Sequence, residues 1–431
     1  MKSRANNMMH HVIGSQPIDR SHMDERPEKA IFTIAPVGAC CNLACSYCYH
    51  ADIRHRTRAF DVMSEEILTN VIATTVNSAR VVQYTWHGGE PLLAGQDFFS
   101  RVAKFQERFA STEGTKVINH IQTNLTLLSK KMAKWLKHYD FQLSTSLDGP
   151  REFHDRLRRF PNGRGTFDVV MDKLRLCQDV GLPYGVICVV SQINADYPET
   201  VYSFLTEAAP YGFDFSICSD RLGSSTFIPS SRQLLHFFKR AFDLWYGEFD
   251  GRIPVRTFVG IIERLLGGSP SDCTFAQHGC GIITGIDRDG TVYPCARFLG
   301  VPDFALGKVK SQGIDTILMQ PKVVATRKNL SLPSSKCTSC RWFFLCGGGC
   351  RFENWFAQSH SNGRNPWCTF RQDLFSHIVR AISSTVEEMV QSIEQEDIPR
   401  LKGQDGVEGS HLKNGKRRVR VRLPYKSQAL F

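Results

Sequence analysis

The 431-residue sequence lacks any apolar run long enough to cross a membrane, because nowhere do about 18 apolar residues follow one another. Its N-terminal segment is polar and has no apolar core, which excludes a secretory signal. Without such a signal, disulfide bonds explain the 15 cysteines poorly, because cytosolic thiols are kept reduced. These absences indicate a cytoplasmic protein whose cysteines hold metal or take part in catalysis.

The positive charge is concentrated in one segment that lacks acids. The formal net charge is +11, and seven Lys or Arg residues lie between Lys413 and Lys426 without an acidic residue. The rest of the chain therefore carries about +4 (11 − 7), which does not indicate a nucleic-acid-binding domain. We expect neither a nucleic-acid nor a membrane partner. Residues 418–423 alternate charged and apolar side chains, as in a strand that pairs with a peptide, but a disordered basic tail explains them equally simply.

Short apolar runs alternate with amphipathic segments between residues 31 and 250. Runs rich in β-branched and aromatic residues predict strands, and apolar residues at three- and four-residue spacing predict helices between them. Six such repeats favour an α/β fold with a parallel sheet, either open and doubly wound or a partial barrel. The predicted strands are 31–36, 81–87, 117–123, 141–147, 184–191 and 213–218, and the predicted helices are 64–78, 97–110, 129–138, 167–180, 198–209 and 231–249.

The repeats stop near residue 250, and the composition then changes. A chain of 431 residues is too long for one ordinary core. Residues 267–271, rich in glycine and serine, look like a boundary. We therefore divide the chain into a flexible leader (1–30), the strand–helix repeats (31–250), a cysteine-rich region (251–370), a helix (371–394) and a basic tail (395–431).

Three cysteines follow the first predicted strand as Cys41-x3-Cys45-x2-Cys48. Ligands bind at the carboxyl ends of parallel strands in βα folds. Three thiolates can hold a four-iron cluster while leaving one iron open to a cofactor. A zinc loop and metal-free buried cysteines are the alternatives, but this triplet, with Tyr47 before its last cysteine, is more specific than an isolated cysteine pair.

Polar or glycine-rich motifs follow the next predicted strands. Paired glycines let backbone carbonyls approach a ligand closely, Glu90 offers a counter-charge to an ammonium group, and Arg158 offers a fork for a carboxylate. Taken singly, each motif is also compatible with an ordinary turn. The motifs are Gly88-Gly89-Glu90-Pro91, Gln122-Thr123-Asn124, Ser146-Leu147-Asp148-Gly149 and His154-Asp155-x2-Arg158.

With these motifs in this order, residues 31 to about 370 resemble the radical S-adenosylmethionine (SAM) superfamily. The resemblance implies a partial (β/α)6 TIM-type barrel over residues 31–250, a four-iron cluster on the three-cysteine loop, and bound SAM. The residues that it implies for SAM binding are Tyr47, Gly88, Gly89, Glu90, Asn124, Ser146, Asp148 and Arg158.

Eight further cysteines lie in the region that follows, with Gly290 at a fixed offset in Cys280-x9-Gly290-x4-Cys295. This region resembles the SPASM domain, which holds auxiliary four-iron clusters, so we expect three clusters in all. A zinc ribbon is the alternative for the tightly spaced cysteines. The resemblance implies one ligand set of Cys273, Cys280, Cys295 and Cys350 and another of Cys337, Cys340, Cys346 and Cys368.

Within the superfamily, the chain looks like the SPASM peptide maturases, which act on a precursor peptide or protein and take electrons from a reductant such as flavodoxin or ferredoxin. In sulfatase maturases, which make formylglycine, an Asp proposed as the catalytic base follows Tyr-Pro-Cys. Here Ala296 follows Cys295, and alanine cannot accept a proton. We therefore expect a radical SAM oxidoreductase that forms a cyclophane, carbon–carbon or thioether cross-link in a ribosomally synthesised peptide. A formylglycine-generating maturase and a non-catalytic iron–sulfur or zinc scaffold are the alternatives, and no catalytic side chain is assigned.

Overall fold

The computed structural model describes most of the chain between residues 26 and 395. Cys280 and the basic tail lie outside the described residues, so the predictions about them remain predictions. The described ranges are 26–54, 60–110, 114–219, 226–247, 253–268, 273, 283–309, 312–360, 365 and 367–395.

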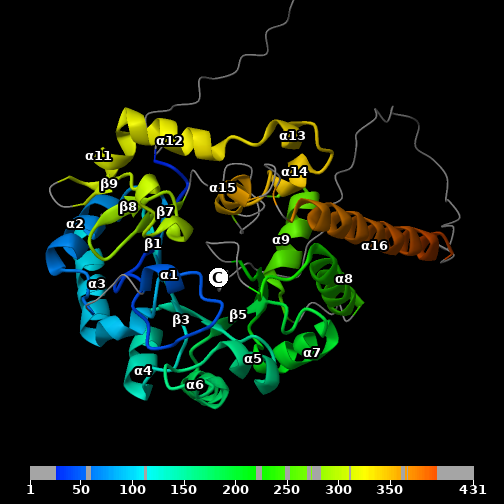
Figure 1. Ribbon diagram of the computed structural model, residues 1–431, viewed down its shortest axis with the longest axis horizontal. Coiled ribbons are helices and arrows are strands. Elements are labelled where there is room, and N and C mark those ends of the chain that lie inside the picture. The colour runs from blue at the N-terminus through cyan, green and yellow to red at the C-terminus, as the bar shows by residue number, and fades with distance from the viewer. Residues whose placement is uncertain are drawn as a thin grey trace, which may run out of the picture.

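The strands form one continuous sheet in the order β6-β5-β4-β3-β2-β1-β7-β8-β9. From β1 to β6, every pair of neighbours is parallel and consecutive in sequence. This order is that of a partial (β/α)6 barrel rather than of an open doubly wound sheet, which confirms the expected fold (Figure 1). The strands are β1 (Lys29–Ile34), β2 (Val81–Trp86), β3 (Lys116–Thr123), β4 (Gln142–Ser146), β5 (Tyr184–Val190), β6 (Phe213–Ile217), β7 (Ile283–Ile286), β8 (Thr291–Tyr293) and β9 (Gly307–Lys308).

Most helices of the first part follow one another round the outer side of the curved sheet, whereas the short helix α1 lies inside the ring that they form (Figure 1). Their ends carry the expected signals: Ser64 and Ser129 each accept a first-turn N–H with their side-chain oxygen, and Gly181 ends a helix in the left-handed conformation. These helices are α1 (Ala51–Arg54), α2 (Glu65–Thr75), η1 (Pro91–Ala94), α3 (Gly95–Phe109), α4 (Lys130–His138), α5 (Arg151–Leu157), α6 (Phe167–Val180), α7 (Pro198–Ala208), α8 (Ser231–Gly247) and α9 (Arg256–Leu265).

The two faces of the barrel strands differ sharply in polarity. On β2, Tyr84 and Trp86 are fully buried, and Trp86 packs edge-on against Phe98 and Phe99 of α3. Because side chains alternate along a strand, the residue between them, Thr85, points into the barrel, where it lines a cavity. The apolar outer face thus makes the core with the helices, and the polar inner face is left for ligands.

The cysteine-rich part extends the same sheet. β7 pairs in parallel with β1, so that Ile31 lies opposite Ile283, and β8 and β9 follow in antiparallel order. On the other side, Phe370 packs against Phe238 of α8. This part therefore contacts both ends of the open barrel (Figure 1). Its helices are η3 (Ala296–Phe298), η4 (Pro302–Phe304), α11 (Ile314–Met319), α12 (Pro321–Ser331), α13 (Ser335–Thr338), α14 (Phe343–Cys346), α15 (Arg351–His360) and α16 (Cys368–Gln395).

The barrel elements agree with the sequence predictions to within three residues at each end. Among the described elements, those that were not predicted are α1, η1, α5, α9 and the elements after residue 282 other than α16. The proposed division into domains remains a prediction, since one sheet runs through both parts. Among the helices that the structure describes, none is both long and apolar enough to cross a bilayer.

Candidate active site

A cavity of about 490 Å³ opens at the carboxyl ends of the barrel strands, beneath the cysteine-rich part. Both cysteine regions reach it: Cys41, Cys45 and Cys48 line one wall, and Cys295 and Cys350 line another. The described lining includes four arginines and no aspartate or glutamate. The structure thus gathers thiols from residues 41 to 350 around one space.

The three-cysteine loop is held by its own backbone and by Asn124. The Cys48 N–H donates to the Cys45 carbonyl oxygen at 3.2 Å, which curls the loop, and all three thiols line the cavity. The Asn124 amide lies 3.7 Å from Cys41 Sγ. The pKa of the Cys41 thiol is raised to about 12, mainly by burial, with smaller contributions from the charges of Glu90, Cys45 and Cys48. Such a triplet gives up its protons when it binds iron, because the ligand is the thiolate.

A buried polar network lies beneath this loop and contains three of the predicted SAM-binding residues. The Tyr47 hydroxyl donates to Asp148 Oδ2 at 2.5 Å, and Arg158 Nε donates to the same oxygen at 2.8 Å. Burial alone would raise the pKa of Asp148, but the Arg158 guanidinium holds it below its ordinary value. Tyr47 and Arg158 also line the cavity, whereas Asp148 supports them from behind.

The glycine pair after β2 passes unusually close to the cysteine loop. A Cβ atom on Gly89 would lie only 1.8 Å from the Cys40 carbonyl oxygen, and Gly88 has a φ of +105°. No other residue type fits either position without moving the backbone. Both glycines line the cavity, as expected of residues that let a ligand approach the main chain.

Glu90 lies behind the cavity wall rather than on it. It is fully buried, and its carboxylate accepts hydrogen bonds from the Thr123 hydroxyl at 2.6 Å and the Asn124 N–H at 2.7 Å. Burial raises the pKa of Glu90 to about 7. Its role as a partner of the SAM ammonium remains a prediction; the geometry shows it joining the end of β3 to the segment that follows β2. Asn124 and Ser146 do line the cavity.

Some cysteines of the second part lie near one another within the described residues, and the proposed ligand sets remain a prediction. Gln372 Nε2 lies 3.4 Å from Cys368 Sγ and 3.8 Å from Cys340 Sγ. Burial raises the pKa of Cys337, and the neighbouring Cys346 and Cys368 raise it further. Of the other set, Cys273, Cys295 and Cys350 line the cavity, and Cys280 lies outside the described residues.

Arg297 is the prominent site residue that sequence reasoning missed. It lines the cavity, and its Nη1 lies 3.0 Å from Glu353 Oε1 and 3.6 Å from Cys350 Sγ. Its position two residues after Cys295 was the available signal, but the contact with Glu353 depends on the fold. Four cysteines without a ligand role were expected to be buried: Cys177, Cys188 and Cys218 are buried, as small apolar residues are, whereas Cys40 is only partly buried.

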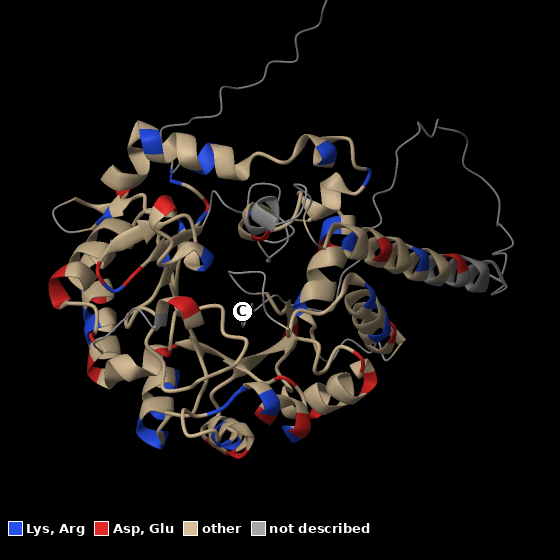
Figure 2. Ribbon diagram, in the orientation of Figure 1, with Lys and Arg blue, Asp and Glu red and all other residues tan. Residues whose placement is uncertain are grey.

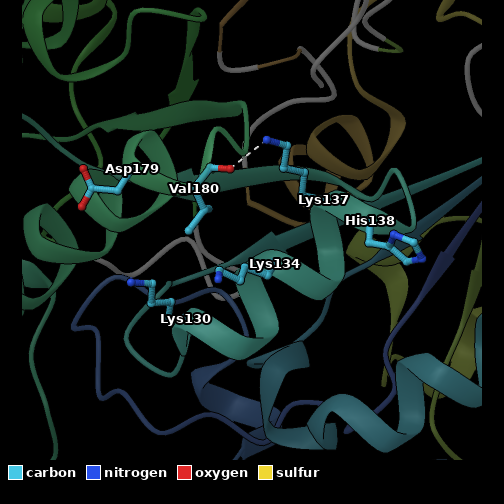
Figure 3. Close-up of a pocket in the computed structure, with 6 residues that line it drawn as sticks. All are labelled: Lys130, Lys134, Lys137, His138, Asp179 and Val180. Carbon is cyan, nitrogen blue, oxygen red and sulfur yellow. Dashed lines mark hydrogen bonds between the residues drawn. The ribbon is translucent and has the colours of Figure 1, made fainter.

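A second hollow, of about 610 Å³, lies on the outer surface where α4 faces the end of α6 (Figure 3). Lys130, Lys134 and Lys137 line it from α4, and Asp179 is its acidic lining residue. Lys137 Nζ donates to the Val180 carbonyl oxygen at 2.9 Å, which satisfies a carbonyl at the negative end of α6. Such charges are spread over the outer helices generally (Figure 2), and this hollow contains no cysteine.

Two family models match the chain. The model of the radical SAM superfamily matches residues 36–205, and the model of an iron–sulfur cluster-binding domain, SPASM, matches residues 280–341. The serine-type anaerobic sulfatase-maturating enzyme of Bacteroides thetaiotaomicron is 30% identical over 371 residues, which is 80% of this chain and 88% of that protein. The chain belongs to the radical SAM/SPASM maturases.

Other similar proteins also match along most of this chain. The cysteine-type anaerobic sulfatase-maturating enzyme of Clostridium perfringens is 30% identical over 328 residues, covering 74% of this chain and 88% of that protein. The solved structure of native anSMEcpe with bound AdoMet and Cp18Cys peptide aligns with a TM-score of 0.74 at 27% identity, covering 84% of this chain and 99% of that one. Streptococcus suis SuiB bound to precursor peptide SuiA aligns with a TM-score of 0.55 at 17% identity, covering 79% and 74%, and shows the fold alone.

The expected cross-linking of a ribosomal peptide is wrong. The two relatives named above, which match this maturase along most of its length, are sulfatase-maturating enzymes, and the likeness to SuiB is confined to the fold. The prediction failed because it rested on one side chain, Ala296, whereas the comparison weighs the whole chain.

The maturase is a radical SAM enzyme that acts on a peptide or protein, with three four-iron clusters and SAM as cofactors. The described thiols fit this set. The loop of Cys41, Cys45 and Cys48 offers three thiols to the cavity, which would leave one iron open, and the cysteine-rich part offers further thiols; which cysteines hold which cluster remains a prediction. The non-catalytic scaffold and the zinc ribbon are therefore set aside.

Proposed function

We propose that this maturase oxidises a serine or cysteine side chain of a target protein to formylglycine, as in anaerobic sulfatase maturation. The observation that carries the proposal is that the three-thiol loop and Cys295 and Cys350 face one cavity of about 490 Å³. A side chain bound there has the SAM-binding wall on one side and an auxiliary cluster on the other. The sulfatase-maturating relatives support this substrate class.

The residues of the chain divide into holders of cofactor and supports. We propose that Cys41, Cys45 and Cys48 hold the SAM-binding cluster. The auxiliary clusters are proposed on Cys273, Cys280, Cys295 and Cys350, and on Cys337, Cys340, Cys346 and Cys368. Residues proposed to contact or position SAM are Tyr47, Gly88, Gly89, Glu90, Asn124, Ser146, Asp148 and Arg158.

When bound, SAM and the reduced cluster supply a radical able to take a hydrogen atom from an unactivated C–H bond. The chain itself provides orientation: the glycine pair lets a ligand lie against the main chain, and the Asp148 network fixes Tyr47 and Arg158 on the wall. The cysteine-rich part lies over the cavity and shields it from water. We also propose that flavodoxin or ferredoxin delivers the electron, and a cytoplasmic location remains a prediction.

The test uses the anaerobically reconstituted full chain with SAM, dithionite and a synthetic sulfatase-type peptide that has serine or cysteine at the modified position. The expected products are 5′-deoxyadenosine and a peptide aldehyde, which a hydrazine probe captures. The probe separates an aldehyde from a cross-link, since both lose two hydrogens from a serine peptide. A Cys45→Ala variant serves as the control and should cleave no SAM while keeping about eight irons. Absence of aldehyde from both peptides, with SAM cleavage intact, would refute the formylglycine assignment.

A further inference from the structure

Arg297 joins three segments that are far apart in the sequence at the wall of the cavity. Its Nη1 lies 3.6 Å from Cys350 Sγ and its Nη2 lies 3.4 Å from the Ser219 hydroxyl, while the guanidinium stands over the Phe352 ring at 5.6 Å. The side chain is 30% exposed, so it reaches from the open cavity to a cysteine sulfur. It is a charged group that lines the cavity and also lies within 3.6 Å of the Cys350 sulfur.

A buried pair behind Arg297 holds it in this place. Glu353 accepts hydrogen bonds from Arg297 on Oε1 at 3.0 Å and from Arg371 on Oε2 at 3.1 Å. The side chains of Glu353 and Arg371 are 9% and 5% exposed. Arg371 also packs under Gly349, where a Cβ atom would lie 2.1 Å from its Nη1. Two guanidinium groups thus share one carboxylate, which leaves an excess positive charge beside Cys350.

A four-iron cluster with four thiolate ligands is an anion whose charge grows on reduction, and hydrogen bonds or positive charges at its sulfurs favour the reduced form. Resting on the cluster ligands of the proposed function, we propose that Arg297 is a positioning residue that raises the reduction potential of the auxiliary cluster bound by Cys350. It thereby makes that cluster the acceptor of the electron that the substrate releases. Ser219 and Glu353 set the direction of its guanidinium.

The electron has a defined origin. When the Cβ carbon of a serine becomes an aldehyde carbon, one C–H and one O–H bond break and the second C–O bond forms. One hydrogen atom goes to the SAM-derived radical, one proton goes to solvent, and one electron remains. The four-iron cluster beside Arg297 is the one-electron acceptor, so the step balances.

The test measures midpoint potentials by EPR-monitored redox titration in the full chain carrying Cys45→Ala, which leaves the auxiliary clusters to give the signal. Arg297→Gln removes a positive charge and should lower one potential, whereas Glu353→Gln removes a negative charge and should raise the same one. The matched control is Arg264→Gln, because that guanidinium donates to the backbone oxygen of Phe344 at 2.9 Å and to no cysteine. It should leave both potentials unchanged.

The proposal would be overturned if the midpoint potential shifted in the same direction in Arg297→Gln and Glu353→Gln, or did not shift. Altered packing alone does not predict shifts of opposite sign in the two variants. If Arg297→Gln loses iron, Arg297→Lys decides: it keeps the charge and should retain both clusters with a smaller fall in potential, and its loss of iron would reduce Arg297 to a structural role. Cys350→Ala tests the ligand set separately. An unchanged iron content in Cys350→Ala refutes the ligand assignment. If Cys350→Ala loses iron but the potentials in Arg297→Gln do not shift, only the redox role of Arg297 is refuted.

Discussion

Replacing Asp148 by asparagine should destabilise the barrel strongly, because this carboxylate is the centre of the network beneath the cysteine loop. Its Oδ2 accepts from Tyr47 at 2.5 Å and from Arg158 Nε at 2.8 Å, and its Oδ1 accepts from the Val189 N–H at 3.0 Å. Asp148 itself is 1% exposed. Asparagine has the same shape but no charge, and its amide group would face donors on both sides.

The magnitude follows from burial. The Asp148 and Arg158 side chains are 1% and 10% exposed, so removing one partner leaves a charge in the interior without compensation. Breaking a buried pair in this way costs about 3–5 kcal/mol in the free energy of unfolding. At about 2–4 °C per kcal/mol for a unit of this size, the midpoint of thermal unfolding should fall by roughly 6–20 °C.

Anaerobic thermal unfolding followed by circular dichroism measures this fall. The matched control is Asp172→Asn, the same chemical change in an ion pair with Arg175 whose two side chains are 68% and 67% exposed. Water already solvates that pair, so its midpoint should not change. If Asp148→Asn unfolds at the temperature of the control, the network does not stabilise the fold and the reasoning fails.

Three further predictions concern the cavity and its supports. Gly89→Ala should abolish SAM binding measured by equilibrium dialysis, because the added Cβ would meet a backbone oxygen at 1.8 Å. Gly260→Ala in α9, whose Cβ would meet nothing within 4 Å, should instead stabilise the chain by about 0.5–1 kcal/mol. Normal SAM binding by Gly89→Ala would contradict the close approach. Burial raises the pKa of Glu90 from 4.5 to about 7, so the folded chain binds this proton more tightly than the unfolded chain. The wild type should therefore lose stability as the pH rises from 4.5 to about 7, and Glu90→Gln should not. Unfolding midpoints that change with pH in the same way in both proteins would contradict this prediction. Gln372→Ala removes an amide 3.4 Å from a cysteine sulfur, and a chelator should then extract auxiliary iron faster, as followed by absorbance; an unchanged rate would show that the amide does not protect the cluster.

The barrel was predictable because its signals are local. Apolar runs such as residues 186–190 and serine N-caps such as Ser64 act within a few residues, so the six repeats predict a parallel α/β sheet, whereas the strand order of a partial barrel came from the resemblance to the radical SAM superfamily. The strands β7 to β9 were not predictable, since they have only four, three and two residues. Their place beside β1 depends on pairing between residues near 31 and 283, which no local pattern encodes.

The site divides in the same way. Cysteine spacing identified the thiols, because ligand sets have short, fixed offsets. The direction of Glu90 was not predictable, since the backbone that leaves the glycine pair turns its carboxylate toward Thr123 instead of the cavity. The contact of Arg297 with Glu353 and Ser219 joins three distant segments, so only the folded chain brings it together.

The pairing of β7 with β1 means that the two halves of the chain are not interchangeable modules. Cutting the gene between them would leave the six residues of β1 as a bare edge whose unpaired N–H and C=O groups invite aggregation. A chimera that borrows the cysteine-rich half of another maturase must reproduce the register of Ile31 opposite Ile283, because a shift of one residue would turn every side chain of the joining strand to the wrong face. Diversification of such a chain is therefore confined to loops and wall residues, with the seam between the halves held constant.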